Sequence, residues 1–392
     1  MKKLFVFLVS LITMMSITGC VNNAAAAVSS VEVSSVSSSE AASSAAVVES
    51  SVSAASEGSS QKAPWPTQEW SKASPKEQGL NPDILAKADA RIAENYPNVY
   101  SLLVVRHGYL VYEKYYQGMS AENANPVYSV TKSVLSALTG IAIRERLITG
   151  IDQKVSELLP DYYKDIDDIR KKDITVKNVL TMSGGLESID KDYYSFFSSP
   201  DWFAYTLKKP LVDKPGEKFV YNTGLTHFLS RIITNTSGIS TKDFAQKYLF
   251  SQIGINAKNW DKDSTGCYGG GAGLYLTPQD MARFGYLYLN NGIWDGKQVI
   301  PAEWVKESST KQISVENGVD YGYLFWMRKT TNTATGKDIF TYQADGAGGQ
   351  KIIIFPEQNM VAVVTAGVNL SSKDGLDTQR IVADFVAQAV VE

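Results

Sequence analysis

A serine and a lysine three residues apart form the pair of side chains best suited to chemistry, Ser129 and Lys132. The Ser-x-x-Lys pattern occurs four times, but only this copy opens a long apolar segment. The serines of the other copies, which lie in a low-complexity tract or in polar, loop-like stretches, are Ser59, Ser188 and Ser308. A spacing of three places Ser129 and Lys132 on one face of a helix, one turn apart.

Lys132 is the only charged residue between Glu122 and Arg144, so we expect its side chain to be buried. Burial disfavours the ammonium form and lowers the pKa, and a neutral amine can take the proton of the Ser129 hydroxyl. The N-terminus of the helix offers N–H groups to a developing oxyanion. The alternative is a serine N-cap beside a lysine whose amine reaches solvent. The residues alone leave both interpretations open.

Other catalytic chemistries have little support. Only two histidines are present, His107 in an expected turn and His227 in an expected helix, which leaves few ways to form a Ser-His-Asp triad. No Gly-x-Ser-x-Gly turn and no zinc-ligand spacing occur, so neither metal nor cofactor is expected. We expect Cys267 to be a packed, inert cysteine.

The part of the chain before Pro64 differs in kind from the part that follows. Residues 1–20 combine two lysines, a short apolar run and Ile-Thr-Gly before Cys20, which resembles the lipobox of bacterial lipoproteins. This resemblance implies export and a lipid on Cys20, which would anchor the protein at the outer face of the cytoplasmic membrane, or at an outer membrane if the envelope has one. Residues 21–63 are rich in Ser, Ala, Val and Glu and indicate a disordered tether.

Residues 64–392 have the length and composition of one globular domain. The whole chain is 44% hydrophobic and 20% charged, with a net charge of −3, so no nucleic-acid partner is expected. Asn81-Pro82 predicts a helix start, and apolar runs flank a His107-Gly108 turn as in a β-hairpin. The sequence also predicts helices at 130–146, from Thr277 onward and at 377–390. It predicts a loop at 269–273 and strands at 351–355 and 361–366. The predicted strands lie near the start and near the end of the domain sequence, with helices between them, which indicates an α+β fold. We expect an antiparallel sheet built from both chain ends, flanked by helices, with an inserted helical lobe.

Several motifs, in order, resemble those of serine β-lactamases and penicillin-binding proteins, in the branch related to class C β-lactamases. The first is Tyr-Ser-Val-Thr-Lys-Ser at 128–133, and the second is Pro-Gly-Glu-Lys-Phe-Val-Tyr-Asn-Thr-Gly at 215–224. The third is Ala-Asp-Gly-Ala-Gly-Gly-Gln at 344–350. Segments 174–186, 274–285 and 300–304 also match. The resemblance covers roughly residues 65–390 and implies a β-lactamase/transpeptidase-like fold.

The resemblance also implies roles for individual residues. Ser129 becomes the acylated nucleophile and Lys132 its base, while Tyr221 passes a proton to the leaving group or activates the deacylating water. A phenolate at Tyr221 would be favoured by a cationic Lys132, and which of the two is the base stays open. The oxyanion hole would be the backbone N–H groups of Ser129 and Ala347, with Gly346 allowing close approach of substrate.

Two departures from the family pattern affect the residues expected to bind substrate. Thr223 replaces the asparagine of Tyr-x-Asn, and a hydroxyl does not reproduce the reach of an amide. Ala344-Asp345-Gly346 replaces Lys-Thr-Gly, so the usual cation is absent and Asp345 adds an anion. The Ala-x-Gly form is similar to the branch of carboxylesterases and nylon-oligomer amide hydrolases.

The leading hypothesis is therefore a serine hydrolase that cleaves an ester or amide, in a small molecule or in the cell wall, through a Ser129 acyl-enzyme. The alternatives within enzymes are a D,D-peptidase, a D-alanyl esterase or a β-lactamase. The alternative from another class is a non-catalytic wall-binding or penicillin-sensing protein on the same fold.

Overall fold

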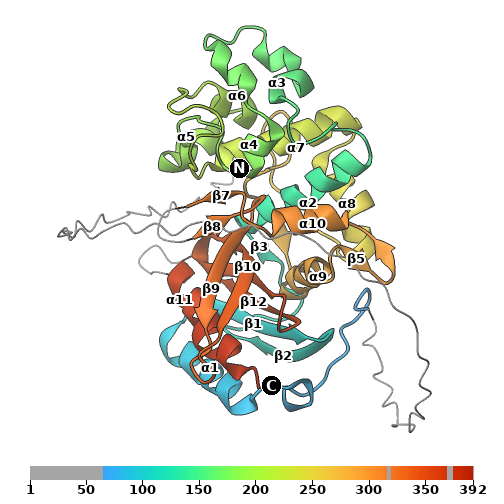
Figure 1. Cartoon of the computed structure of the whole chain (residues 1–392), viewed down its shortest axis with the longest axis vertical. Coiled ribbons are helices and arrows are strands. Elements are labelled where there is room, and N and C mark those ends of the chain that lie inside the picture. The colour runs from blue at the N-terminus through green and yellow to red at the C-terminus, as the bar shows by residue number, and fades with distance from the viewer. Residues whose placement is uncertain (1–64, 316–318, 369–373, 392) are drawn as a thin grey trace, which may run out of the picture. The chain divides into compact units, whose positions relative to one another are not determined.

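The central element is an antiparallel sheet of eight strands, in the order β2-β1-β12-β11-β10-β9-β8-β7. The computed structural model describes residues 65–315, 319–368 and 374–391. The predicted signal peptide, its Cys20 and the tether at 21–63 lie outside these residues. The strands are β1 (Val99–Arg106), β2 (Tyr109–Tyr115), β7 (Ile313–Ser314), β8 (Asp320–Tyr321), β9 (Trp326–Thr331), β10 (Asp338–Gly346), β11 (Gln350–Phe355) and β12 (Met360–Ala366) (Figure 1).

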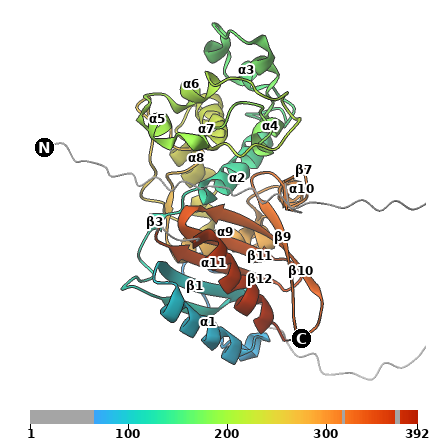
Figure 2. The ribbon, with the colours of Figure 1, turned by 90° about the vertical axis from the view of Figure 1, so that its left-hand side faces the viewer.

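The middle strands are apolar on both faces because each face is covered by helices. Along β1, Leu103 and Val105 face one core, whereas Leu102 and Val104 face the other. One face packs against α2 (Val130–Arg144) and α9 (Pro278–Leu289). The other is covered by α1 (Pro82–Asn95) and the C-terminal helices, α11 (Asp374–Ile381), η8 (Val382–Val386) and η9 (Ala387–Ala389) (Figure 2). The result is three layers with two apolar cores.

Local signals in the sequence explain where several of these elements begin. The Asn81 side chain accepts a hydrogen bond from the N–H of Asp83, and Pro82 occupies the first helical position of α1. Thr277 and Asp280 form a capping box that starts α9. His107 and Gly108 have φ of 50° and 87° and join β1 to β2, as a two-residue hairpin turn requires.

Helices between the two halves of the sheet form the inserted lobe. They are α3 (Val155–Leu158), α4 (Val176–Leu180), α5 (Tyr193–Ser198), α6 (Trp202–Leu207), α7 (Thr223–Ser237) and α8 (Thr241–Tyr248), with the short turns η2 (Pro160–Tyr163), η3 (Ile169–Asp173), η4 (Ile189–Lys191) and η5 (Phe250–Ile253). The short strands β3 (Asn125–Pro126) and β4 (Tyr275–Leu276) pair beside the start of α2, and α10 (Ala302–Ser308) packs against α2. The remaining short elements are η1 (Lys76–Gln78), β5 (Ile293–Trp294) and β6 (Lys297–Gln298). In the described ranges, no helix is both long and apolar enough to cross a bilayer.

The predicted α+β architecture, with a sheet from both chain ends and helices inserted between, is confirmed. One local expectation is wrong. Ser308 lies at the end of α10 rather than in a polar loop, and its buried hydroxyl donates to the carbonyl of Trp304. The polar run that follows Ser308 in the sequence concealed the apolar face of this helix.

Candidate active site

Ser129 lies immediately before α2, and its side chain contacts the amine of Lys132. The preceding residue, Tyr128, has φ of 47°, a conformation that strains a bulky side chain. Ser129 is half-buried and occupies the N-cap position, but its hydroxyl makes no capping hydrogen bond. The alternative interpretation of Ser129 as a simple helix cap is therefore wrong. Within the described part of the chain, its backbone N–H donates to no other backbone group.

The Lys132 side chain is buried, with 1% exposed, and its amine lies against Ser129. The amine nitrogen Nζ is 2.9 Å from Ser129 Oγ, 3.1 Å from Thr223 Oγ1 and 2.6 Å from the carbonyl oxygen of Gly271. Burial lowers the pKa of Lys132 and Asp190 raises it, leaving the pKa at about 7. The expected burial, and the expected placement of both side chains on one helical face, are confirmed.

The glycine loop at 269–273 delivers the carbonyl that holds Lys132. A Cβ at Gly271 would lie 2.3 Å from the carbonyl oxygen of Thr223, so only glycine lets the loop pass this close to the start of α7. The sequence indicated a loop here but gave no sign that one of its carbonyls binds the lysine. The close approach explains both the glycine and the contact.

Tyr221 lies just before α7, and its ring centroid is 4.9 Å from the Lys132 amine. Burial is the main cause that raises the pKa of Tyr221 well above its ordinary value; the nearby Tyr321 and Asp190 add to it, and a hydrogen bond with Ser129 opposes it. The expectation of a phenolate at Tyr221 is therefore wrong. The lysine that was to stabilise it has a pKa of about 7, so its amine is uncharged in a large fraction of molecules at neutral pH and is a weaker cation than expected.

Asp190 is the residue of this site that sequence reasoning missed. It lies in η4, and its carboxylate accepts hydrogen bonds from the Thr223 N–H at 2.7 Å and from the Thr223 hydroxyl at 2.6 Å. The Tyr193 hydroxyl also donates to it. No motif spacing connects Asp190 to Thr223, because the two are far apart in the sequence and only the folded chain brings them together. Thr223 is thus a link between Lys132 and Asp190, rather than a group that faces only substrate.

Gly346 and Ala347 mark the point where β10 reaches the start of α2. A Cβ at Gly346 would lie 2.3 Å from the carbonyl oxygen of Val127, so glycine permits this approach. Ala347 begins the turn η7 (Ala347–Gly349) directly after it. Both residues predicted to supply the oxyanion hole therefore border the same junction between α2 and β10.

The third motif has no cation at its first position, and the charge of its aspartate is paired. Ala344 is fully buried. Asp345 pairs with Lys351 at 3.0 Å and lies 3.7 Å from Arg328. The sequence showed the anion of Asp345, but the two cations that offset its charge come from neighbouring strands.

A second buried cluster, formed by His227, Asp263 and Cys267, adjoins the glycine loop. His227 Nε2 lies 3.4 Å from Asp263 Oδ2, and Nδ1 accepts a hydrogen bond from the N–H of Gly270. Burial lowers the pKa of His227, but Cys267 and Asp263 raise it by more, so the net direction is upward. Cys267 is 1% exposed, which confirms the packed cysteine. Burial raises the pKa of its thiol, but His227, Arg231 and Ser230 together lower it by more. This cluster holds the glycine loop in place.

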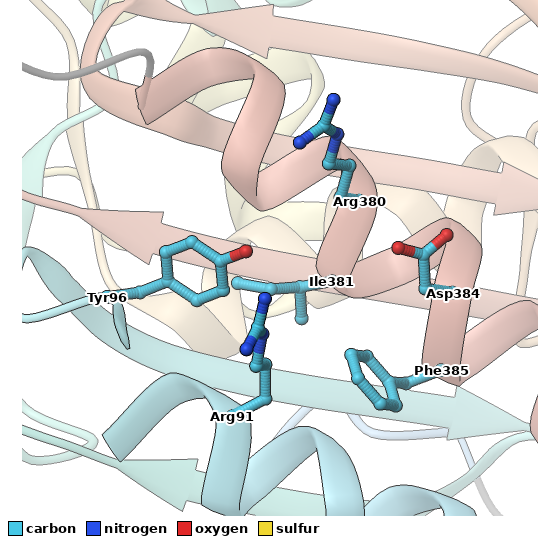
Figure 3. Close-up of a pocket in the computed structure, with 6 residues that line it drawn as sticks. All are labelled: Arg91, Tyr96, Arg380, Ile381, Asp384 and Phe385. Atoms are coloured by element: carbon cyan, nitrogen blue, oxygen red, sulfur yellow. The ribbon is translucent and has the colours of Figure 1, made fainter. Parts of the chain in front are cut away.

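A separate hollow of about 390 Å³ lies on the opposite face of the sheet, between α1 and α11 with its continuation η8 (Figure 3). Its lining residues are Arg91, Tyr96, Arg380, Ile381, Asp384 and Phe385. It contains no nucleophile. Among the described residues, no three side chains of the His, Cys, Asp and Glu types gather in a way that suits a metal ion.

An antiparallel sheet beside a helix that opens with Ser-x-x-Lys defines the class of β-lactamases and penicillin-binding proteins. The model of the Beta-lactamase family matches residues 90–387, which is well over half of the sequence. The chain therefore belongs to the β-lactamase family.

Individual relatives agree with this assignment. The chain is 24% identical over 288 residues to a 6-aminohexanoate-dimer hydrolase of Paenarthrobacter ureafaciens, covering 67% of this chain and 71% of that protein. Among solved structures, EstCE1, described as a hydrolase with promiscuous acyltransferase activity, has a TM-score of 0.65 at 15% identity, over 81% of this chain and 100% of that one. An octameric penicillin-binding protein homologue from Pyrococcus abyssi has a TM-score of 0.61 at 18% identity, over 78% and 77%. At these identities the structures show a shared fold, and family and relatives together support a hydrolase.

Proposed function

We propose that this protein is a serine hydrolase that cleaves an ester or amide bond through an acyl-enzyme on Ser129. The observation that carries the proposal is the contact between Ser129 Oγ and the buried amine of Lys132, at 2.9 Å, with the pKa of that amine at about 7. An amine with this pKa is neutral in a large fraction of molecules at neutral pH and can accept the hydroxyl proton.

Acylation follows from these groups. Lys132 takes the proton of Ser129, and Oγ forms a bond to the carbonyl carbon of the substrate. The negative charge on the carbonyl oxygen is stabilised by the N–H groups of Ser129 and Ala347. The bond to the leaving group then breaks, and the departing oxygen or nitrogen takes a proton.

Tyr221 suits the role of proton donor to that leaving group, because its raised pKa keeps the phenol protonated. The proton that Lys132 took from Ser129 then returns to Tyr221, which leaves the amine neutral again. Water attacks the acyl-enzyme and gives a proton to Lys132, the bond between the acyl carbon and Ser129 Oγ breaks, and Lys132 returns the proton to Oγ, which releases the acid and free Ser129. Of the two groups between which the sequence did not choose, Lys132 is thus the base in this proposal and Tyr221 the acid.

The fully buried Ala344 favours an ester or simple amide over a β-lactam or a peptide with a free carboxylate, since no cation occupies that position. The experiment is intact-mass spectrometry of the purified protein with a fluorophosphonate, and in parallel with a penicillin, beside Ser129→Ala. We expect a covalent fluorophosphonate adduct that Ser129→Ala abolishes.

The two reagents separate the remaining functions. A stable penicillin adduct would favour a penicillin-binding enzyme or sensor, and penicillin turnover a β-lactamase. A folded protein that reacts with neither reagent would contradict the proposed mechanism and favour a non-catalytic wall-binding protein.

We also propose that the protein is exported and held at the membrane by a lipid on Cys20, acting on small-molecule or cell-wall substrates at the outer surface. The support is the pattern of residues 1–20 and the tether-like composition of residues 21–63. Mass spectrometry of the N-terminal peptide from producing cells tests it. A peptide that begins at Cys20 and carries a lipid is expected, and an unmodified Cys20 would contradict the proposal.

A further inference from the structure

We propose that Asp190 is a positioning residue that acts through Thr223 to turn the amine of Lys132, so that its lone pair points at Ser129. This inference rests on the proposed function and adds a residue to it.

The first contact fixes the proton of Thr223. An ionised carboxylate accepts hydrogen bonds and has none to donate. Asp190 accepts from the N–H and from the hydroxyl of Thr223, at 2.7 and 2.6 Å, and from the hydroxyl of Tyr193. The single hydroxyl proton of Thr223 is therefore directed at Asp190, and its oxygen is left as an acceptor toward Lys132.

The neutral amine of Lys132 has two N–H bonds and one lone pair. Thr223 Oγ1, 3.1 Å away, and the Gly271 carbonyl oxygen, 2.6 Å away, both accept from Lys132. These two contacts use both N–H bonds, and the third neighbour at 2.9 Å is Ser129 Oγ. While the amine is protonated, its third N–H bond donates to Ser129 Oγ. Once the amine is neutral, that direction holds the lone pair, which faces the nucleophile and can accept the proton of the Ser129 hydroxyl.

The local structure holds Asp190 firmly in this role. Ser188, the N-cap of η4, lies 3.0 Å from the Asp190 carboxylate and 2.7 Å from the backbone carbonyl of Tyr221, and its N-capping bond comes from the Asp190 N–H. The turn that carries Asp190 is thus tied to the segment that carries Tyr221 and Thr223. A shift of either segment would be passed to the other.

Asp190 also acts on Lys132 through its charge. A single hydroxyl oxygen separates the two groups, since Thr223 Oγ1 is 2.6 Å from the carboxylate and 3.1 Å from the amine. Burial lowers the pKa of Lys132, and Asp190 counteracts this effect. The other titratable groups that face this cluster are Tyr221, before α7, and Tyr193, on α5. Both have raised pKa values and are neutral phenols. Burial remains the main influence on the pKa of Lys132, and Asp190 is the charge that opposes it.

The test is the rate of fluorophosphonate labelling of the full chain as a function of pH, for wild type and Asp190→Asn. We expect the acid midpoint of the labelling rate to move down by about one pH unit, because a nearby carboxylate is lost. We also expect the plateau rate to fall at least about tenfold, because an amide can donate to Thr223 and turn its hydroxyl toward Lys132. Asp192→Asn is the matched control, since Asp192 only caps α5 and asparagine also caps helices well.

A second pair of variants covers the case in which Asp190→Asn does not fold. Thr223→Ser keeps the linking hydroxyl and should label within about threefold of wild type, whereas Thr223→Val should lose at least about tenfold. Equal rates for these two variants would overturn the inference.

The outcomes separate this inference from the function on which it rests. If wild type forms no adduct, the proposed function fails and the inference with it. If wild type labels but Asp190→Asn loses rate with an unmoved midpoint, Asp190 has only a structural role, and the inference alone is wrong.

Discussion

Replacing the buried lysine by methionine should stabilise the protein while it abolishes labelling of Ser129. In the native state, the pKa of Lys132 falls from its ordinary value of 10.5 to about 7. Each tenfold change in a protonation equilibrium corresponds to about 1.4 kcal/mol, so burying this amine costs about 4 to 5 kcal/mol at neutral pH. Methionine has a similar length and no charge, and Lys132→Met removes this cost.

The gain is reduced by the hydrogen-bond acceptors that the lysine leaves behind. The carbonyl oxygen of Gly271 and the hydroxyl oxygen of Thr223 each lose a buried donor, at about 1 to 2 kcal/mol apiece. The net expectation for Lys132→Met at pH 7 is therefore a rise of about 0 to 3 kcal/mol in the free energy of unfolding.

The stability difference between the variant and wild type should depend on pH. Between pH 7 and 10.5 the unfolded chain holds a proton on Lys132 that the folded chain has released, so the stability of wild type rises with pH in this window. The variant lacks this contribution. Its advantage over wild type should be largest at pH 7 and below, and should shrink as the pH approaches 10.

Urea unfolding followed by circular dichroism at pH 6.5, 8 and 9.5 measures the difference, and fluorophosphonate labelling measures the loss of reactivity. Lys171→Met is the matched control, because Lys171 is also buried and binds the carbonyl of Leu207, with no contact to Ser129. It should keep full labelling. A Lys132→Met protein that is less stable than wild type by the same amount at every pH would refute the reasoning. It would mean that the lysine is charged and paired with Asp190.

Two further substitutions test other parts of the site. Gly346→Ala places a Cβ 2.3 Å from the carbonyl oxygen of Val127, so β10 must move and take Ala347 with it; labelling should fall about 10- to 100-fold, with about 1 to 3 kcal/mol lost in urea unfolding. An unchanged labelling rate would contradict the assignment of the oxyanion hole. Tyr221→Phe should leave fluorophosphonate labelling within about tenfold of wild type, but slow hydrolysis of an alkyl ester at least about 100-fold, because alkoxide departure needs a proton. Equal losses on an alkyl ester and on an activated nitrophenyl ester would contradict that role.

The parts of the fold that the sequence predicted correctly are those encoded by neighbouring residues. Asn81-Pro82 and Thr277 start helices through caps that span only a few positions. The contact between Ser129 and Lys132 follows from helical spacing, and the burial of the lysine follows from the apolar residues around it. These features depend only on residues close together in the sequence, so they can be predicted without knowledge of the fold.

The parts that could not be predicted depend on residues that meet only in the folded chain. Asp190 reaches Thr223, and Lys351 and Arg328 reach Asp345, through tertiary contacts that no motif encodes. The error on Tyr221 has a different cause. Its expected low pKa assumed a cationic neighbour, but burial of the phenol itself raises its pKa, and burial of Lys132 also weakens the cation beside it. Two linked titrations cannot be assigned one residue at a time.

The sheet joins strands from the first and the last parts of the domain, which limits the order in which the molecule can fold. Strand β1, from the first part of the domain, is hydrogen-bonded on one side to β12, which belongs to the last part of the domain to be synthesised. A contact between such distant segments closes a very long loop and is expected to form slowly. While the chain is being made, β1 can pair with β2 but lacks β12 on its other side, and the face of β11 that covers α2 does not yet exist. Ala347, the expected second donor of the oxyanion hole, follows β10 in the chain, so an unfinished chain carries Ser129 in an incomplete site.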